Sequence, residues 1–308
     1  ASAAGRSVRV AALLVLSLAT VAVGAGHPAR AHLEDQAVFR SGVSAVRLDV
    51  LVVRDGRAVP GLTSGDFEVL DNGVRQEVQA VWAERLPLDV AFVLDRSSSV
   101  AGDELARLKA AVRATLDTLR DTDRAALLTF AHTVTLHSPI GSDTTALASA
   151  LDKVSAGGAT CAIDAVHAAL SMSHGSGRRT VVLLYSDGFD NRSWLGPEDI
   201  VQAARESEAV IYSVAFVPPS RSRGFPKLLP PSVGLLRTLS EESGGEVFTA
   251  REGGEIASSF ARVLETMRAR YLLTYTPRDG ERRGWHELKV KLRRGGGNLV
   301  VRSGYHVR

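Results

Sequence analysis

The sequence is poor in cysteine, in aromatic residues and in clustered charge. Cys161 is the only cysteine among 308 residues, so no disulfide bond can form within the chain and the core alone must hold the fold. Basic residues number 37 against 34 acidic ones, but they are dispersed. Arg282-Arg283 and Arg293-Arg294 are only pairs, and no aromatic platform lies between them. The composition therefore argues against nucleic-acid binding.

Long hydrophobic runs are also scarce, and the one clear run lies near the N-terminus. Arg6 and Arg9 precede an apolar stretch over residues 10–23, and residues 24–31 end in Ala-Arg-Ala. This order is typical of a secretory signal peptide, so we expect a signal peptide over 1–31, cleaved after Ala31. The protein would then be periplasmic, at the cell surface or secreted. The run is short for a membrane span, although an uncleaved anchor remains the alternative.

The remaining chain changes its pattern twice. Residues 37–86 contain strand patterns and turn signals, including strands over 46–52 and 74–81, but too few strands for a closed sandwich. Strands then alternate with helices over 87–269, which is typical of a doubly wound, mostly parallel, Rossmann-like α/β sheet. Strand patterns return over 270–308 and end with a strand over 299–307. We expect the two flanks to form one small all-β sandwich into which the α/β domain is inserted; three separate units are the alternative.

The stretch 88–99, LDVAFVLDRSSS, is the most informative part of the sequence. Its apolar first half predicts a strand that is buried on both faces. Asp95, Ser97 and Ser99 then follow as one carboxylate and two hydroxyls, which are the hard oxygen ligands that Mg²⁺ or Mn²⁺ prefers. The same residue types also occur at helix N-caps, so this segment alone leaves both interpretations open.

Two further side chains are expected at the same edge of the sheet. Asp187 follows a second buried strand over 180–185, and Thr160 lies in a Gly-rich loop before a helix over 163–172. Ligands of open parallel sheets bind at the carboxyl ends of strands where the winding reverses. If the two strands are neighbours at that point, these side chains meet Asp95 in one crevice. An N-cap role for the segment 95–99 would not explain why Thr160 and Asp187 lie at the same place.

With this spacing the chain resembles the von Willebrand factor type A (VWA) domain and its metal-ion-dependent adhesion site (MIDAS). The resemblance rests on the DxSxS pattern of Asp95, Ser97 and Ser99, on Thr160 in GGATCAIDA and on Asp187 in LLYSDGFDN. Segments 59–67, 271–273 and 302–305 resemble the exported, acidobacterial-type subgroup, in which β segments flank the domain. The sequence departs from the common pattern at Ala159, where glycine is usual, and at Cys161; neither change removes a ligand.

The resemblance implies a metal-dependent protein-binding or adhesion module rather than an enzyme. It implies one Mg²⁺, or Mn²⁺ or Ca²⁺, that a Glu or Asp of a partner protein completes; no small-molecule substrate is expected. The implied ligands are Asp95, Ser97, Ser99, Thr160 and Asp187. The weaker candidates for contacts at the rim are Arg96, Ser98, Cys161 and Trp194.

Two alternatives stay open, an uncharacterised hydrolase and a metal-free structural module of the cell envelope. A serine hydrolase would need a nucleophile elbow, and Gly175-Ser176-Gly177 lacks its spacing. His286-Glu287 has no second His at the spacing of a zinc protease. Among the other residues, we interpret Cys161 as a small buried hydrophobe and Asp89 as a strand-edge residue. Asp190 and Asn191 are interpreted as turn residues, and the three tryptophans as packing residues.

Overall fold

The computed structural model describes residues 45–83, 86–172, 178–217, 233–250, 253–278 and 283–307. All described residues belong to one compact unit, 42–308. The expected signal peptide lies outside the described residues. Within the described part of the chain, no helix combines the length and the apolar character that crossing a membrane requires.

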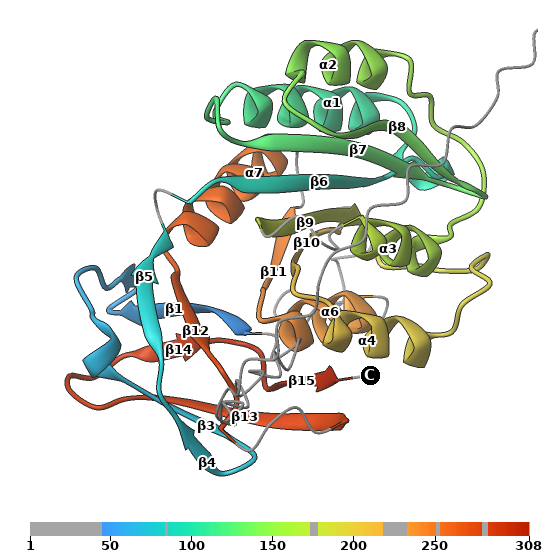
Figure 1. Ribbon diagram of the computed structural model, residues 1–308. Helices are drawn as coiled ribbons and strands as arrows, with labels where there is room; N and C mark the ends of the chain where they lie inside the picture. Colours follow the sequence, from blue (N-terminus) through green and yellow to red (C-terminus); the bar gives the residue numbers. More distant parts are fainter. Residues whose placement is uncertain are drawn as a thin grey trace, which may run out of the picture. The chain divides into compact units, whose positions relative to one another are not determined.

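The centre of the protein is a six-stranded, mostly parallel sheet with the order β11-β10-β9-β6-β7-β8 (Figure 1). Its strands are β6 (Leu88–Asp95), β7 (Arg124–Phe130), β8 (Val134–Gly141), β9 (Arg179–Ser186), β10 (Val210–Phe216) and β11 (Val247–Ala250). Only β8, at one edge, runs antiparallel to its neighbour. The chain winds outward from β6 to β8 and then from β9 to β11, so the winding reverses between β6 and β9. The loops that follow these two strands therefore start side by side.

Helices cover both faces of this sheet, as its buried strands require. On one face α1 (Asp103–Leu116), α2 (Thr144–Asp152) and α7 (Gly253–Arg268) pack against alternate residues of β6, such as Phe92. On the other face α3 (Ala162–Ser171), α4 (Pro197–Glu206) and α6 (Gly234–Ser243) pack against the residues between them, such as Val93. All residues of β6 are buried, so the prediction of a central two-sided strand is confirmed.

The two flanks of the chain form two antiparallel sheets that share one core. The first sheet contains β1 (Val46–Arg54), β2 (Arg57–Ala58), β5 (Gln79–Trp82), β12 (Tyr271–Tyr275) and β14 (Asn298–Val300). The second contains β3 (Phe67–Asp71), which follows a short 3₁₀ helix (Ser64–Asp66), β4 (Val74–Gln76), β13 (Gly284–Leu292) and β15 (Gly304–Val307). N-terminal strands pair with C-terminal ones in both sheets, as in Leu48 opposite Leu273 and Val69 opposite Val290. The predicted insertion of an α/β domain into a sandwich is confirmed.

Two predicted strands of the flanks are each broken into two. The strand expected over 74–81 is β4 and β5, and the strand expected over 299–307 is β14 and β15. In both cases the chain leaves one sheet and enters the other. A period-2 pattern shows that residues alternate between core and solvent, but it does not show which sheet they join. The prediction of one continuous strand in each of these two segments was therefore wrong.

Three buried arginines connect the sandwich strands to the α/β domain. Arg302, between β14 and β15, donates hydrogen bonds to the carbonyl oxygens of Ser207 at 2.7 Å and Ala204 at 2.8 Å, at the C-terminal end of α4. Arg179 forms an ion pair with Asp49 of β1. Arg270 donates to the Asp49 carbonyl at 3.0 Å. A cation at a helix C-terminus satisfies carbonyls that have no partner within the helix.

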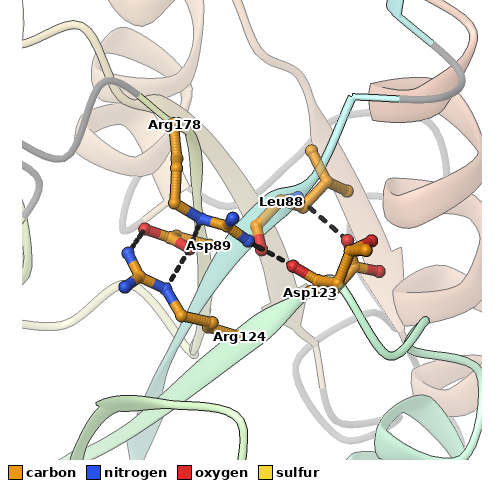
Figure 2. Close-up of polar contacts among 6 residues, drawn as sticks. Leu88, Asp89, Asp123, Arg124 and Arg178 are labelled. Atoms are coloured by element: carbon orange, nitrogen blue, oxygen red, sulfur yellow. Dashed lines mark hydrogen bonds and ion pairs between the residues drawn. The ribbon is translucent and has the colours of Figure 1, made fainter.

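A second polar cluster lies at the amino ends of the central strands (Figure 2). Asp89 is buried within β6, and its carboxylate accepts hydrogen bonds from Arg124 Nε at 2.9 Å and Arg178 Nε at 2.6 Å. Asp123 accepts the Leu88 N–H at 2.9 Å. The sequence placed Asp89 at the edge of the strand, before the central run; it is instead the second residue of β6, buried and paired with arginines from other parts of the sequence.

We expect Arg302→Met to lower the free energy of unfolding by about 2–3 kcal/mol, because buried carbonyls of α4 would lose charged donors. Urea denaturation measures this change. Arg278→Met is the control: Arg278 forms an exposed ion pair with Glu77, and its removal should change stability by less than about 0.5 kcal/mol. Equal effects of the two substitutions would contradict the proposed anchoring of α4.

We expect Asp89→Asn to destabilise the protein at neutral pH and much less in acid. Burial alone would raise the pKa of Asp89, but the hydrogen bonds and charges of Arg124 and Arg178 outweigh it and lower the pKa. Stability from such a group is present above the pKa of an unfolded aspartate, about 3.9, and is lost as the pH falls through the lower folded value. The wild-type advantage in urea denaturation should therefore shrink below about pH 4. A difference independent of pH would contradict this role.

Candidate metal site

Strand β6 ends at Asp95, whose side chain is completely buried. One carboxylate oxygen, Oδ1, accepts the Ser97 N–H at 2.8 Å. The other, Oδ2, accepts the hydroxyl of Ser186 at the end of β9, at 2.9 Å. The carboxylate thus joins the carboxyl ends of the two strands between which the winding reverses. This is the place at which the sequence predicted a crevice.

The two serines of the loop after β6 lie next to each other. Their hydroxyl oxygens are 3.1 Å apart, with Ser97 buried and Ser99 exposed. Helix α1 begins only at Asp103, and its N-cap is Gly102. Ser97 precedes the 3₁₀ helix η3 (Ser98–Val100), but its side chain makes no capping hydrogen bond. Ser97 therefore occupies the N-cap position of η3, but no side chain of this segment caps η3 or α1 through a hydrogen bond.

Thr160 belongs to a loop that is bonded to the other two. Its buried backbone forms two hydrogen bonds with Asn191 in the loop after β9: the Thr160 N–H donates to Asn191 Oδ1 at 2.9 Å, and the Asn191 N–H donates to the Thr160 carbonyl at 3.0 Å. In the same loop Gly157 donates to the Arg96 carbonyl at 2.7 Å. A network of hydrogen bonds therefore fixes the three loops that carry the predicted ligands.

Asp187 follows Ser186 directly and is also buried. Its Oδ1 accepts the Phe189 N–H at 3.2 Å. Burial raises the pKa of Asp95 to about 6, against the hydrogen bonds from Ser97 and Ser186, and the nearby charge of Asp187 raises it further. Two buried carboxylates therefore lie close enough to influence each other at the carboxyl ends of β6 and β9. Among the described ion pairs, none joins Asp95 to a Lys, Arg or His.

The donor set fits a hard divalent cation. Asp95 and Asp187 supply carboxylates, and Ser97, Ser99 and Thr160 carry hydroxyl groups, all of them oxygen donors of the kind that Mg²⁺, Mn²⁺ and Ca²⁺ prefer. In the described part of the chain, no three His, Cys, Asp or Glu side chains gather to hold a metal ion. Hydroxyl oxygens would therefore have to complete the coordination, together with water.

Several residues of the site escaped the sequence interpretation. Ser186 bonds Asp95, and Asn191 positions Thr160, although it was interpreted as a turn residue. Glu104 of α1 is a third buried carboxylate, which accepts the Tyr185 hydroxyl at 2.8 Å. Burial raises the pKa of Tyr185, and the charges of Glu104, Asp95 and Asp187 raise it further. Nothing in the local sequence distinguishes Glu104 from an ordinary acidic residue in the first turn of a helix.

The four candidates for the rim have different surroundings. Arg96 is half-buried and donates to the Ser155 carbonyl at 3.3 Å, and Ser98 is exposed. Cys161 is only 2% exposed, and burial together with Asp164 and Asp190 raises the pKa of its thiol to about 11. It lies in the core as a small hydrophobe and not at the rim. Trp194 is 96% exposed, so its interpretation as a packing residue was wrong.

Comparisons with known proteins address the fold. The family model of the von Willebrand factor type A domain matches residues 89–262. Among solved structures, a von Willebrand factor type A protein from Catenulispora acidiphila is 14% identical with a TM-score of 0.51, covering 82% of this chain and 75% of its own. Proximal thread matrix protein 1 from the mussel byssus, with a zinc-occupied MIDAS motif, is 22% identical with a TM-score of 0.51. That match covers 65% of this chain and 50% of the mussel protein.

The search of curated proteins found no match. The two structural likenesses support the fold alone, because both identities are low. The family model, however, covers more than half of the chain, from the second residue of β6 into α7. On this evidence, the chain belongs to the von Willebrand factor type A domain family.

Proposed function

We propose that this protein is an exported, metal-dependent protein-binding module. A divalent cation is held by Asp95, Ser97, Ser99, Thr160 and Asp187 and captures an acidic side chain of a partner protein. The observation that carries the proposal is the Asp95 carboxylate: it is fully buried, the charge of Asp187 lies near it, and none of the described ion pairs includes Asp95. A buried charge of this kind is costly unless a counter-ion balances it.

The ligand chemistry explains why such a site would bind an acid. The hydroxyl groups are neutral, so the cation is balanced only by the two carboxylates. Mg²⁺ keeps several waters in an octahedral shell, and a carboxylate from a partner can replace one of them. The zinc-occupied MIDAS of the mussel protein supports metal binding at this place in the fold. The choice among Mg²⁺, Mn²⁺ and Ca²⁺ is left to titration.

The other parts of the proposal rest on the sequence and on the family. Export rests on the signal-peptide pattern of residues 1–31, which lie outside the described part of the chain. VWA domains are typically adhesion or interaction modules, which supports binding over catalysis. A metal-free structural module of the cell envelope would share the same fold, so metal binding is the measurement that separates it from the proposed function.

We expect the wild-type chain to bind one divalent cation in calorimetric titration with Mg²⁺ or Mn²⁺. Asp187→Asn should weaken this binding by at least about tenfold, because a charged ligand is lost, which is about 1.4 kcal/mol. Asp152→Asn is the control, since Asp152 is exposed and pairs with Arg113 on α1. No binding by the wild type, or equal binding by the Asp187 variant, would contradict the site.

We expect capture of the natural partner to require both the metal and a partner carboxylate. Crosslinked pull-down from native envelope or medium should yield the same protein in Mg²⁺ with the wild type and with Asp152→Asn. That protein should be lost in EDTA, with Asp187→Ala, and after chemical amidation of the carboxylates of the envelope proteins. Circular dichroism checks that Asp187→Ala stays folded. Capture that continues in EDTA would contradict the mechanism.

A further inference from the structure

The loop between β9 and α4 carries two exposed aromatic side chains. Trp194 is 96% exposed and Phe189 is 47% exposed. Tryptophan is normally among the largest contributors to a buried core, whereas fully exposed large apolar groups that lie together mark interaction surfaces. This loop starts directly after Asp187, so both rings lie on the loop that follows a candidate metal ligand.

The backbone around Trp194 is held in a defined position. The Trp194 N–H donates to Asp164 Oδ2 at 3.0 Å, and the Leu195 N–H donates to Asp164 Oδ1 at 3.1 Å. On the preceding side, Asp190 accepts the Ser193 N–H at 3.1 Å and the Ser193 hydroxyl at 2.7 Å. Asp190 also accepts the Ile163 N–H of α3 at 2.9 Å. The exposed ring therefore extends from a backbone that is bonded on both sides to α3.

The same loop is bonded to the residues of the metal site. Asn191 holds the Thr160 backbone by two hydrogen bonds, one through its side-chain oxygen and one through its N–H, and the Phe189 N–H donates to the Asp187 carboxylate at 3.2 Å. Arg192 of this loop is also exposed, so the loop carries a positive charge in addition to its aromatic side chains. The proposed cation, this arginine and the exposed tryptophan together complement a ligand that is both acidic and apolar.

We propose that the partner presents its metal-binding Asp or Glu within a segment that also carries a large apolar side chain, which packs on Trp194. This inference rests on the proposed function, because it assigns the chemistry around the acid that the metal binds. Tryptophan is enriched among the few residues that dominate protein interfaces. Because the backbone that carries this ring is already ordered, binding adds little further ordering of the loop. The acid thus provides the metal bond, and the apolar neighbour provides selectivity.

The test is selection from a random peptide library in which one central position is fixed as Asp or Glu. The full chain is screened in Mg²⁺ as wild type, Trp194→Ala, Trp194→Phe and Asp187→Ala. Leu136→Ala is the matched control, because Leu136 is another exposed apolar residue, 52% accessible, on edge strand β8. Circular dichroism of each variant checks that it folds. Because Trp194 is exposed, its replacement is expected to leave the core intact.

We expect the wild type and Leu136→Ala to select peptides with an aromatic residue, Leu or Met at a recurring spacing from the acid. Trp194→Ala should bind these peptides roughly 10- to 100-fold more weakly, as for an interface hot spot, and Trp194→Phe should restore part of the loss. Peptides that carry the acid without an apolar neighbour should bind the wild type and Trp194→Ala equally. Asp187→Ala should bind neither kind.

The outcomes separate the inference from the function on which it rests. Metal-dependent selection of acidic peptides without an apolar preference, and with equal affinity for Trp194→Ala, overturns the inference and leaves the proposed function standing. Absence of any metal-dependent binding by the wild type overturns both. A third outcome is that the wild type binds phosphatidylcholine–phosphatidylglycerol vesicles, that Trp194→Ala abolishes this binding, and that the affinity for peptides is unchanged. This outcome would assign the Trp194 ring to a lipid surface and overturn the inference.

Discussion

The rest of the structure depends on one interaction, in which the buried carboxylate at the end of the central strand β6 bonds the residue that ends the neighbouring strand β9. Asp95 lies where β6 leaves the core, and its two oxygens are fixed by the Ser97 N–H and the Ser186 hydroxyl. Because Ser186 ends the neighbouring strand, this carboxylate joins the two halves of the sheet where the winding reverses. Asp187 follows Ser186 directly, and the loop that carries Thr160 is hydrogen-bonded to the loops after both strands, so the candidate ligands gather around the carboxyl ends of β6 and β9.

The two buried aspartates of β6 show how surroundings decide the role of a charge. Burial alone would raise the pKa of both side chains. At Asp89 two arginines outweigh burial and lower the pKa (Figure 2), whereas at Asp95 the nearby Asp187 adds to the effect and the pKa rises to about 6. The amino end of the strand is therefore neutralised within the protein. At the carboxyl end, the proposed divalent cation would balance the charge of Asp95.

The sequence was sufficient for the features that depend on local pattern. The apolar run of β6, the strand–helix alternation and the strand patterns of the flanks predicted the inserted α/β domain. Features that depend on distant partners could not be predicted in this way. Glu104 looks like any acidic residue at a helix start, and Arg302 like any residue of a strand, until Tyr185 and the end of α4 are placed beside them. Asn191 likewise gains its role only through Thr160.

The segment 302–305 shows how the sandwich would contribute to the proposed recognition. Arg302 holds the C-terminal end of α4, and Tyr305 donates to the buried Asp71 of β3 at 2.8 Å. Gly304 lies between them because a Cβ there would collide with the Trp285 ring and the His286 carbonyl. Helix α4 begins at Pro197, directly after the loop that carries Trp194. The flanking strands therefore hold the C-terminal end of α4, and the N-terminal end of α4 follows the proposed recognition loop. The insertion of the α/β domain into the sandwich thus does more than close a second core.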